Sequence, residues 1–292
     1  MKISHTFCSK TMDFLLIGFS LITGFVCSSC HQVRYDSINL SGTWRFQIDR
    51  NDTGESQHWY SILLPDSVIL PGSMATNRKG DSITIHTQWT GQIVDSSWFT
   101  SPEYATYRQP GNIKVPFWLQ PETYYKGSAW YQKEIEIPDD WKDKMMELYL
   151  ERCHWYSKVW IDSAEVGTAN SLSTPHTFLL PSFVRPGKHL LSVRIDNRIH
   201  DIDVGQNSHS ISDHTQTNWN GIVGKMELIA RPKVSLENVK IYPDIPGRQI
   251  KVVIGIFNHT EKPIACKISL RAFPEKNNPA PASEKIRLQK IC

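Results

Sequence analysis

Apolar and polar residues alternate with a period of two in most of the ordered-looking segments of this chain. In Ala129–Ile137, Tyr131 and Ile135 share one face, whereas Glu134 and Glu136 share the other. This alternation is typical of a half-exposed β-strand. The same strand character recurs in Gly42–Asp49, Val68–Gly72, Met146–Leu150, Lys158–Ile161, His176–Leu180 and Leu190–Ile195. Short strands separated by regular turn signals, without an amphipathic helix, predict an all-β protein with an antiparallel sandwich or jelly roll.

A long region, Ser73–Gly127, separates the predicted strands Val68–Gly72 and Ala129–Ile137 and has many turn residues and little periodicity. It is rich in aromatic residues, which disordered segments lack, so we expect an ordered excursion from the sandwich. Trp98 and Arg108 could face a ligand there, but packing over the sandwich is the favoured interpretation for both.

A second long polar segment, Asn207–Gly224, separates the strand-like runs Leu190–Asn197 and Lys225–Ala230. A polar insertion of this length in a compact domain is usually functional or disordered. Trp219 followed by the turn pair Asn220-Gly221 favours an ordered loop. Its hydrogen-bonding groups and single aromatic ring suit a sugar. Alternatively, it is a surface loop whose Trp219 plugs the edge of the sandwich.

Three motifs carry a resemblance to a known family: HSISDHTQTNWNGIVG within the polar loop, NSLSTPH at Asn170–His176 and GSAWYQKEIEIP at Gly127–Pro138. They resemble glycoside hydrolase family 2, which includes β-galactosidases, β-glucuronidases and β-mannosidases, and more closely its long secreted members from Bacteroidetes-type bacteria. The resemblance implies a sugar-binding jelly-roll domain over residues 40–232. It also implies an immunoglobulin-like sandwich from residue 233, of which 60 residues are present against the roughly 100 that such a domain needs. We therefore expect that second domain to be incomplete, and the family's catalytic barrel to lie beyond this chain.

The family resemblance also supplies candidate site residues. It implies that a loop of the first sandwich reaches the substrate pocket, where an acidic side chain binds sugar hydroxyls. Asp213 matches that role by position, although Thr215 or Asn218 could occupy the equivalent place. Trp219 is expected to anchor the loop. The candidate sugar-binding residues are Asp213, Asn218, Trp219, Asn220, Asn170 and His176.

No catalytic residue is assigned, because the family's acid/base and nucleophile are barrel glutamates. Glu134 and Glu136 share a strand face and are expected to be solvated. They do not resemble a retaining pair, whose carboxyl groups lie about 5 Å apart across a bound sugar.

The N-terminus has the pattern of a lipoprotein signal peptide. Lys2 and Lys10 precede the apolar run Phe14–Val26, which is too short to span a membrane comfortably. Small residues come just before Cys30, so we expect a signal peptide at 1–29, lipidation of Cys30 and a tether at 30–39. This would place the protein in the cell envelope, as a periplasmic or outer-membrane lipoprotein. Ordinary secretion with cleavage nearby is the alternative.

Charge and cysteine spacing bear on whether the protein binds nucleic acid or a metal ion. The net charge is +3, and the basic residues are scattered rather than clustered, which does not favour nucleic-acid binding. Cys153, Cys266 and Cys292 are far apart in the sequence and have no metal-ligand spacing. We therefore expect no metal, no cofactor, and buried free thiols at Cys153 and Cys266.

Three interpretations follow. The chain is the N-terminal carbohydrate-binding portion of a family 2 β-glycosidase, without catalytic activity of its own. Alternatively, it is a free-standing carbohydrate-binding lipoprotein, or a truncated gene product with no independent role. In the first two interpretations the partner is a carbohydrate, and contact with a membrane is made only through the lipid.

Overall fold

A computed structural model describes residues 35–199, 208, 211–260 and 262–270. The predicted signal peptide, the lipidation site Cys30 and residues 31–34 of the tether lie outside these ranges. Within them, no helix combines the length and the apolar character needed to cross a membrane.

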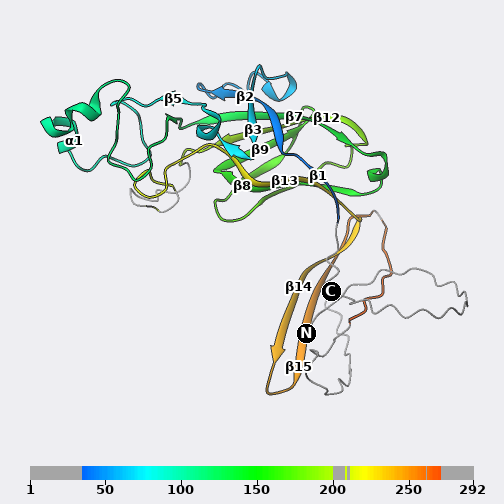
Figure 1. The fold of residues 1–292 in the computed structure, drawn as a ribbon. Helices are drawn as coiled ribbons and strands as arrows, with labels where there is room; N and C mark the ends of the chain where they lie inside the picture. Colours follow the sequence, from blue (N-terminus) through cyan, green and yellow to red (C-terminus); the bar gives the residue numbers. More distant parts are fainter. Residues whose placement is uncertain (1–34, 200–207, 209–210, 261, 271–292) are drawn as a thin grey trace, which may run out of the picture. The chain divides into compact units, whose positions relative to one another are not determined.

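Two antiparallel sheets form a sandwich (Figure 1). The first sheet has the order β1 (Asp36–Asn39), β13 (Gly221–Arg231), β8 (Met145–His154) and β11 (His176–Leu179), and β4 (Gly72–Ser73) also pairs with β13. The second sheet has the order β10 (Ala164–Asn170), β9 (Tyr156–Ile161), β12 (Gly187–Asp196), β7 (Ser128–Ile137), β2 (Gly42–Asp49) and β3 (Asp66–Leu70). From β7 to β13 the chain passes repeatedly from one sheet to the other, as in a jelly roll. The predicted all-β sandwich is confirmed.

The main core lies between the two sheets and is built by the period-two pattern. Tyr131, Ile135 and Ile137 of β7 point into it, as predicted. Phe46 of β2 packs against Tyr131 with ring centroids 5.2 Å apart. The opposing sheet contributes other fully buried side chains, among them Leu148, Leu150 and Ile222.

The outer face of β7 differs from the prediction of a half-exposed strand. Trp130 and Gln132 on this face are fully buried, because the connection between β2 and β3 folds over them. This connection contains the short helix η1 (Trp59–Ser61). The Gln132 amide accepts a hydrogen bond from Leu64 N and donates to the carbonyls of Trp59 and Ile62. A second apolar cluster thus lies outside the sandwich, formed by Leu64, Trp130 and Trp160 with Trp59 and Tyr60 packed against it.

The excursion between β4 and β7 is ordered and has a small core of its own. It contains η2 (Ala75–Asn77), β5 (Asp81–Ser82), α1 (Ser97–Thr100), η3 (Pro102–Arg108) and β6 (Thr123–Tyr124). Trp98 packs with Val115 and Phe117, and its indole N–H donates to Lys114 O. Arg108 donates to the carbonyls of Trp98 and Ser101. The packing interpretation for Trp98 and Arg108 is therefore supported. A further short helix, η4 (Asp139–Trp141), joins β7 to β8.

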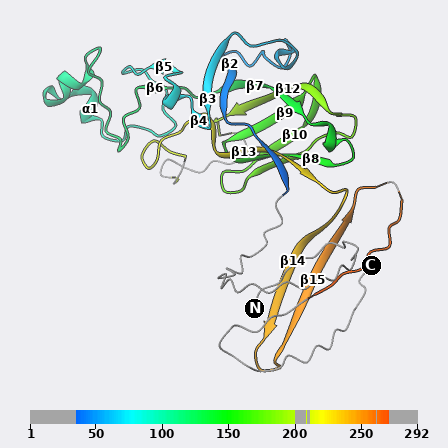
Figure 2. The ribbon, with the colours of Figure 1, turned by 45° about the vertical axis from the view of Figure 1, so that its right-hand side comes forward.

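After the sandwich, β14 (Val234–Asp244) and β15 (Gln249–Asn258) form an antiparallel hairpin (Figure 2). The third strand predicted at Ala265–Ala272 is not found over residues 265–270, the part of that segment that the structure describes. Cys153 is buried as expected, but Cys266 is exposed, which corrects the expectation of a second buried thiol. The immunoglobulin-like character of this region still rests on the family resemblance.

Candidate functional site

The polar loop that leads into β13 is defined by close backbone approaches at its two sides. Gly221 has φ 151° and lies so near β4 that an added Cβ would be 2.4 Å from Gly72 O. On the other side, a Cβ on Gly91 of the excursion would be 3.0 Å from Ser212 Oγ and His214 Cδ2. Thr217 takes a left-handed backbone conformation with φ 64°. Residues 211–220, called here the rim loop, are therefore held between the first sheet and the excursion.

Asp213 is the hydrogen-bonding centre of the rim loop. Its side chain is only 1% exposed, and Oδ2 accepts from Thr90 N at 2.6 Å and Gly91 N at 2.9 Å. The Tyr124 hydroxyl, at 3.3 Å, also donates to Oδ2. Oδ1 accepts from Thr217 Oγ1 at 3.0 Å and from Asn218 N at 3.2 Å.

Because a carboxylate offers about four acceptor positions, these five donors leave none for a sugar hydroxyl. The expectation that Asp213 lies open to a sugar is therefore wrong for this conformation. Instead, Asp213 fastens the excursion to the rim loop. Burial of the Tyr124 hydroxyl, together with the neighbouring Asp213 charge, raises the pKa of Tyr124 well above its ordinary value.

Asn220 is likewise occupied by the protein. It is 1% exposed; its Oδ1 accepts from the Tyr131 hydroxyl, and its Nδ2 donates to the carbonyls of Gly127 and Ile195. It ties the end of the rim loop to β7 and β12. Its assignment as a sugar contact is not supported by this geometry.

Asn218 differs from Asp213 and Asn220 because one of its side-chain atoms has no hydrogen-bond partner among the described residues. Its Nδ2 donates to Thr90 Oγ1 and to Asn197 O, each at 2.8 Å. Its Oδ1 is buried and accepts no hydrogen bond from any described residue, and the same is true of the buried His214 Nε2. A buried acceptor without a partner is costly, so Asn218 Oδ1 and His214 Nε2 are two places where this loop remains unsatisfied.

Trp219 stacks on His154, with ring centroids 4.7 Å apart and ring planes inclined by 28°. The Trp219 side chain is half-buried, and this contact fixes it against the end of β8. The geometry agrees with the role of loop anchor expected for Trp219.

The two candidate residues outside the rim loop, Asn170 and His176, differ in their exposure to solvent. Asn170 is exposed at the end of β10, and the register Asn170↔Tyr156↔Asp196 places it at the same rim as the end of β12. His176, in contrast, is 1% exposed. Its Nδ1 is 2.6 Å from Ser157 Oγ, and its Nε2 is 2.9 Å from Ser171 O. Burial lowers the pKa of His176. It packs inside the sandwich and cannot contact a sugar there, which corrects that assignment.

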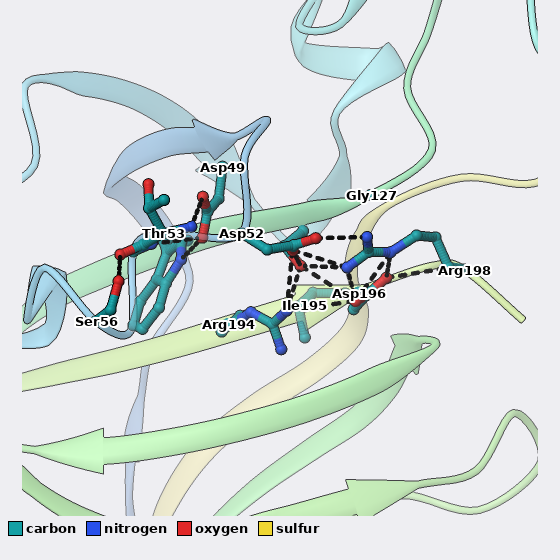
Figure 3. Close-up of polar contacts among 12 residues, drawn as sticks. Asp49, Asp52, Thr53, Ser56, Gly127, Arg194, Ile195, Asp196 and Arg198 are labelled. Carbon is teal, nitrogen blue, oxygen red and sulfur yellow. Dashed lines mark hydrogen bonds and ion pairs between the residues drawn. The ribbon is translucent and has the colours of Figure 1, made fainter. Parts of the chain in front are cut away.

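A cluster of charged residues supports the base of the rim loop and was not anticipated from the sequence (Figure 3). Arg198 bridges Asp196 and Asp52, with nitrogen–oxygen distances of 2.6 and 2.5 Å. Ser128 Oγ lies within hydrogen-bonding distance of both carboxylates, 2.7 Å from Asp52 and 3.1 Å from Asp196, and Arg194 Nη2 donates to Ser128 Oγ. Two aspartates and two arginines therefore balance in charge. The cluster fixes the end of β12, where Asn197 O accepts the hydrogen bond from Asn218.

Nothing in the described part of the chain indicates a metal centre, since no three His, Cys, Asp or Glu residues there are grouped to hold an ion. The chemistry that the rim offers is neutral hydrogen bonding from amides and hydroxyls, together with half-buried aromatic rings.

Two antiparallel sheets, between which the chain passes repeatedly, with an ordered polar loop at one rim, define the class of jelly-roll β-sandwich domains. The chain belongs to glycoside hydrolase family 2: residues 38–232 match the family described as "Glycosyl hydrolases family 2, sugar binding domain".

Two curated relatives are β-galactosidases. The enzyme of Arthrobacter sp. (strain B7) is 24% identical over 215 residues, which is 72% of this chain and 20% of that protein. The enzyme of Priestia megaterium is 21% identical over 233 residues, 78% of this chain and 20% of that protein. The chain thus spans about a fifth of the length of these relatives.

Among solved structures, the β-glucuronidase of Ruminococcus gnavus superposes with a TM-score of 0.52 at 18% identity, over 76% of this chain and 34% of that one. Its complex with D-glucaro 1,5-lactone matches to the same degree. At this identity the similarity establishes the fold.

Proposed function

We propose that this chain is the N-terminal carbohydrate-binding portion of a β-glycosidase that acts on β-galactoside-like substrates. The match of residues 38–232 to the sugar-binding domain of glycoside hydrolase family 2 carries this proposal. The relatives named β-galactosidase and β-glucuronidase support a β-glycoside as the substrate class.

In this proposal the rim loop contributes binding groups and no catalytic group. Asp213 and Asn220 hold the loop in shape, because all their hydrogen-bonding positions are used within the chain. Gln216 is exposed, and its side chain makes no hydrogen bond to any described residue, whereas its backbone N–H donates to Ser212 O. Its side-chain amide can therefore meet a sugar hydroxyl. Asn218 Oδ1 is buried, so it supplies an acceptor for a bound water molecule rather than for the sugar itself.

Hydrolysis with retention requires an acid/base and a nucleophile whose carboxyl groups lie about 5 Å apart. We propose that another part of the enzyme supplies both groups. The purified chain should therefore show no turnover of aryl β-galactoside, β-glucuronide or β-mannoside. Turnover that persists through re-purification would overturn this part of the proposal.

Binding is tested by titration calorimetry of the full chain with methyl β-D-galactopyranoside. A half-enclosed sugar should bind with a Kd of about 1 mM. Gln216→Ala should weaken binding severalfold without changing stability. Gln249→Ala, which removes an exposed amide on β15 that donates to Asp244 Oδ2, is the control outside the rim loop. If Gln216→Ala binds as tightly as the unchanged chain, the rim loop is not the sugar contact.

The leader favours one further proposal. We propose that Cys30 is lipidated and holds the protein at the cell envelope, because an apolar run ends just before Ser28-Ser29-Cys30. With such an anchor, a free-standing carbohydrate-binding lipoprotein is the second candidate function. Cys30→Ala, expressed in a host with two membranes, should move the protein to the soluble fraction. Continued membrane association would contradict lipidation.

A further inference from the structure

A cavity lies at the second sheet, where β2 continues past the end of its neighbour β3. The pairing of β2 with β3 runs from Gly42↔Leu70 to Phe46↔Asp66, so Gln47–Asp49 have no partner on that side. The connection that follows β2 turns away and returns through η1. The space between has a volume of about 510 Å³ and is partly open to solvent. This lies within the range of small-molecule sites, about 300–1,000 Å³.

The walls of this cavity are held rigidly. Asp49, which is 2% exposed, accepts hydrogen bonds from Thr53 N, Gly54 N and the Trp130 indole, contacts drawn in Figure 3. These bonds fix the first turn of the connection. Trp59, which lines the cavity, is oriented by its indole N–H, which donates to Gln57 Oε1 at 3.0 Å. Its ring packs on Trp130 at 6.3 Å between centroids.

Two charged side chains at the cavity, Arg50 and Asp66, are paired within the chain, and the third, Asp49, is buried and accepts three hydrogen bonds from neutral donors. Arg50 makes two hydrogen bonds to the Asp81 carboxylate, at 2.6 and 2.9 Å. Asp66 pairs with Lys79 at 2.6 Å. The lining therefore holds no unpaired cation that could attract a phosphate or a carboxylate, and the acceptor positions of Asp49 face donors of the chain itself.

The groups that remain free are neutral. The side chains of Gln47, Asn51 and Thr53 line the cavity and make no hydrogen bond to any described residue. Two amides and a hydroxyl both donate and accept hydrogen bonds, as sugar hydroxyls do. Trp59 adds an apolar ring surface with fixed orientation beside them.

We propose that this cavity, lined by Gln47, Asn51, Thr53 and Trp59, is a second binding site for a neutral saccharide. None of its lining residues belongs to the rim loop. The site is independent of the proposed function, because it requires no contribution from the rim loop or from a catalytic domain.

The test follows the indole ¹⁵N–¹H signal of Trp59 in the full chain, assigned by its loss in Trp59→Phe. Lactose and methyl β-D-galactopyranoside are the neutral probes; inorganic phosphate and D-glucuronate are the anionic probes. A neutral probe should shift the Trp59 signal saturably, with a Kd of about 1 mM. The anions should leave it unchanged.

Gln47→Ala combined with Asn51→Ala removes two side chains that have no partner among the described residues, so folding should be unaffected. The Kd measured at Trp59 should rise at least tenfold in this double variant and stay constant in Gln249→Ala. Gln216→Ala separates the two sites, since it should weaken binding at the rim loop and leave the Trp59 titration intact. No saturable shift with either neutral probe, an equal response to the anions, or an unchanged Kd in the double variant would each overturn the proposal.

Discussion

Replacing Asp213 with alanine should destabilise the sandwich, because this carboxylate is a buried structural centre. The change removes the acceptor of five hydrogen bonds. The hydroxyls of Tyr124 and Thr217 can rotate to other acceptors, and Thr90 N keeps the Tyr124 hydroxyl as a second acceptor at 3.0 Å. The buried backbone N–H groups of Gly91 and Asn218 lose their acceptor. An unsatisfied buried donor costs about 1–3 kcal/mol, so we expect a total loss of about 3 kcal/mol in the free energy of unfolding.

Urea unfolding of the full chain measures this loss directly. For a domain of this size, each kcal/mol corresponds to about 2–4 °C in Tm, so thermal unfolding should show a decrease of about 6–12 °C. Asp143→Ala removes an exposed carboxylate and is the control, with an expected change within about 0.5 kcal/mol. Hydrogen exchange at Gly91 should accelerate in Asp213→Ala and not in the control. If Asp213→Ala matches Asp143→Ala in both measurements, Asp213 is not a structural centre and its carboxylate is available to a ligand.

Three further predictions concern other parts of the sandwich. Trp130→Ala removes a fully buried ring that stacks on Trp160 and should lower the free energy of unfolding in urea by about 3–5 kcal/mol. Trp118→Ala, at a side chain 86% exposed, should leave it almost unchanged. Equal effects would show that the second apolar cluster does not stabilise the fold. Burial alone would raise the pKa of Asp52, but hydrogen bonds from Arg198, Ser128 and Arg194 outweigh it and lower the pKa. The stability that the ionised Asp52 contributes is complete above the unfolded pKa of about 3.9 and is lost as pH falls through the lower folded pKa. The urea midpoint should therefore decrease below pH 4, and it should decrease less in Arg198→Gln. The same acid sensitivity in both proteins would refute the stabilising contact between Arg198 and Asp52. Burial raises the pKa of the Cys153 thiol, so a thiol reagent should modify the exposed Cys266 in the folded chain and reach Cys153 only on unfolding; rapid modification of Cys153 would show that the core is open.

The alternation of apolar residues was sufficient to predict the sandwich and the inward face of β7. The outer face of β7 could not be predicted from it, because Trp130 and Gln132 are covered by a connection without periodicity. That connection is fixed by hydrogen bonds to side chains far away in sequence, such as Gln132 to Leu64. A period-two pattern describes a strand's own faces, not what a distant loop places over them.

The candidate site, too, could be predicted only in part from the local sequence. The polar loop and its anchor Trp219 could be identified from composition and turn residues. The structural role of Asp213 could not, because its main partners, Thr90 and Gly91, lie more than 120 residues earlier. Nor does any local signal distinguish Asn218, which keeps a free acceptor, from Asn220, which has none. His176 ends the polar segment Asn170–His176 and begins a predicted strand, and nothing local shows that its side chain is buried beside Ser157.

Sugar binding by the rim loop can be measured by titrating the ¹⁵N-labelled full chain with methyl β-D-galactopyranoside and following the backbone amide signals of residues 211–221. We expect saturable shifts at Gln216–Gly221 that disappear in Gln216→Ala. Unchanged signals across this segment, at concentrations well above about 1 mM, would contradict this expectation even if the sugar bound elsewhere on the sandwich.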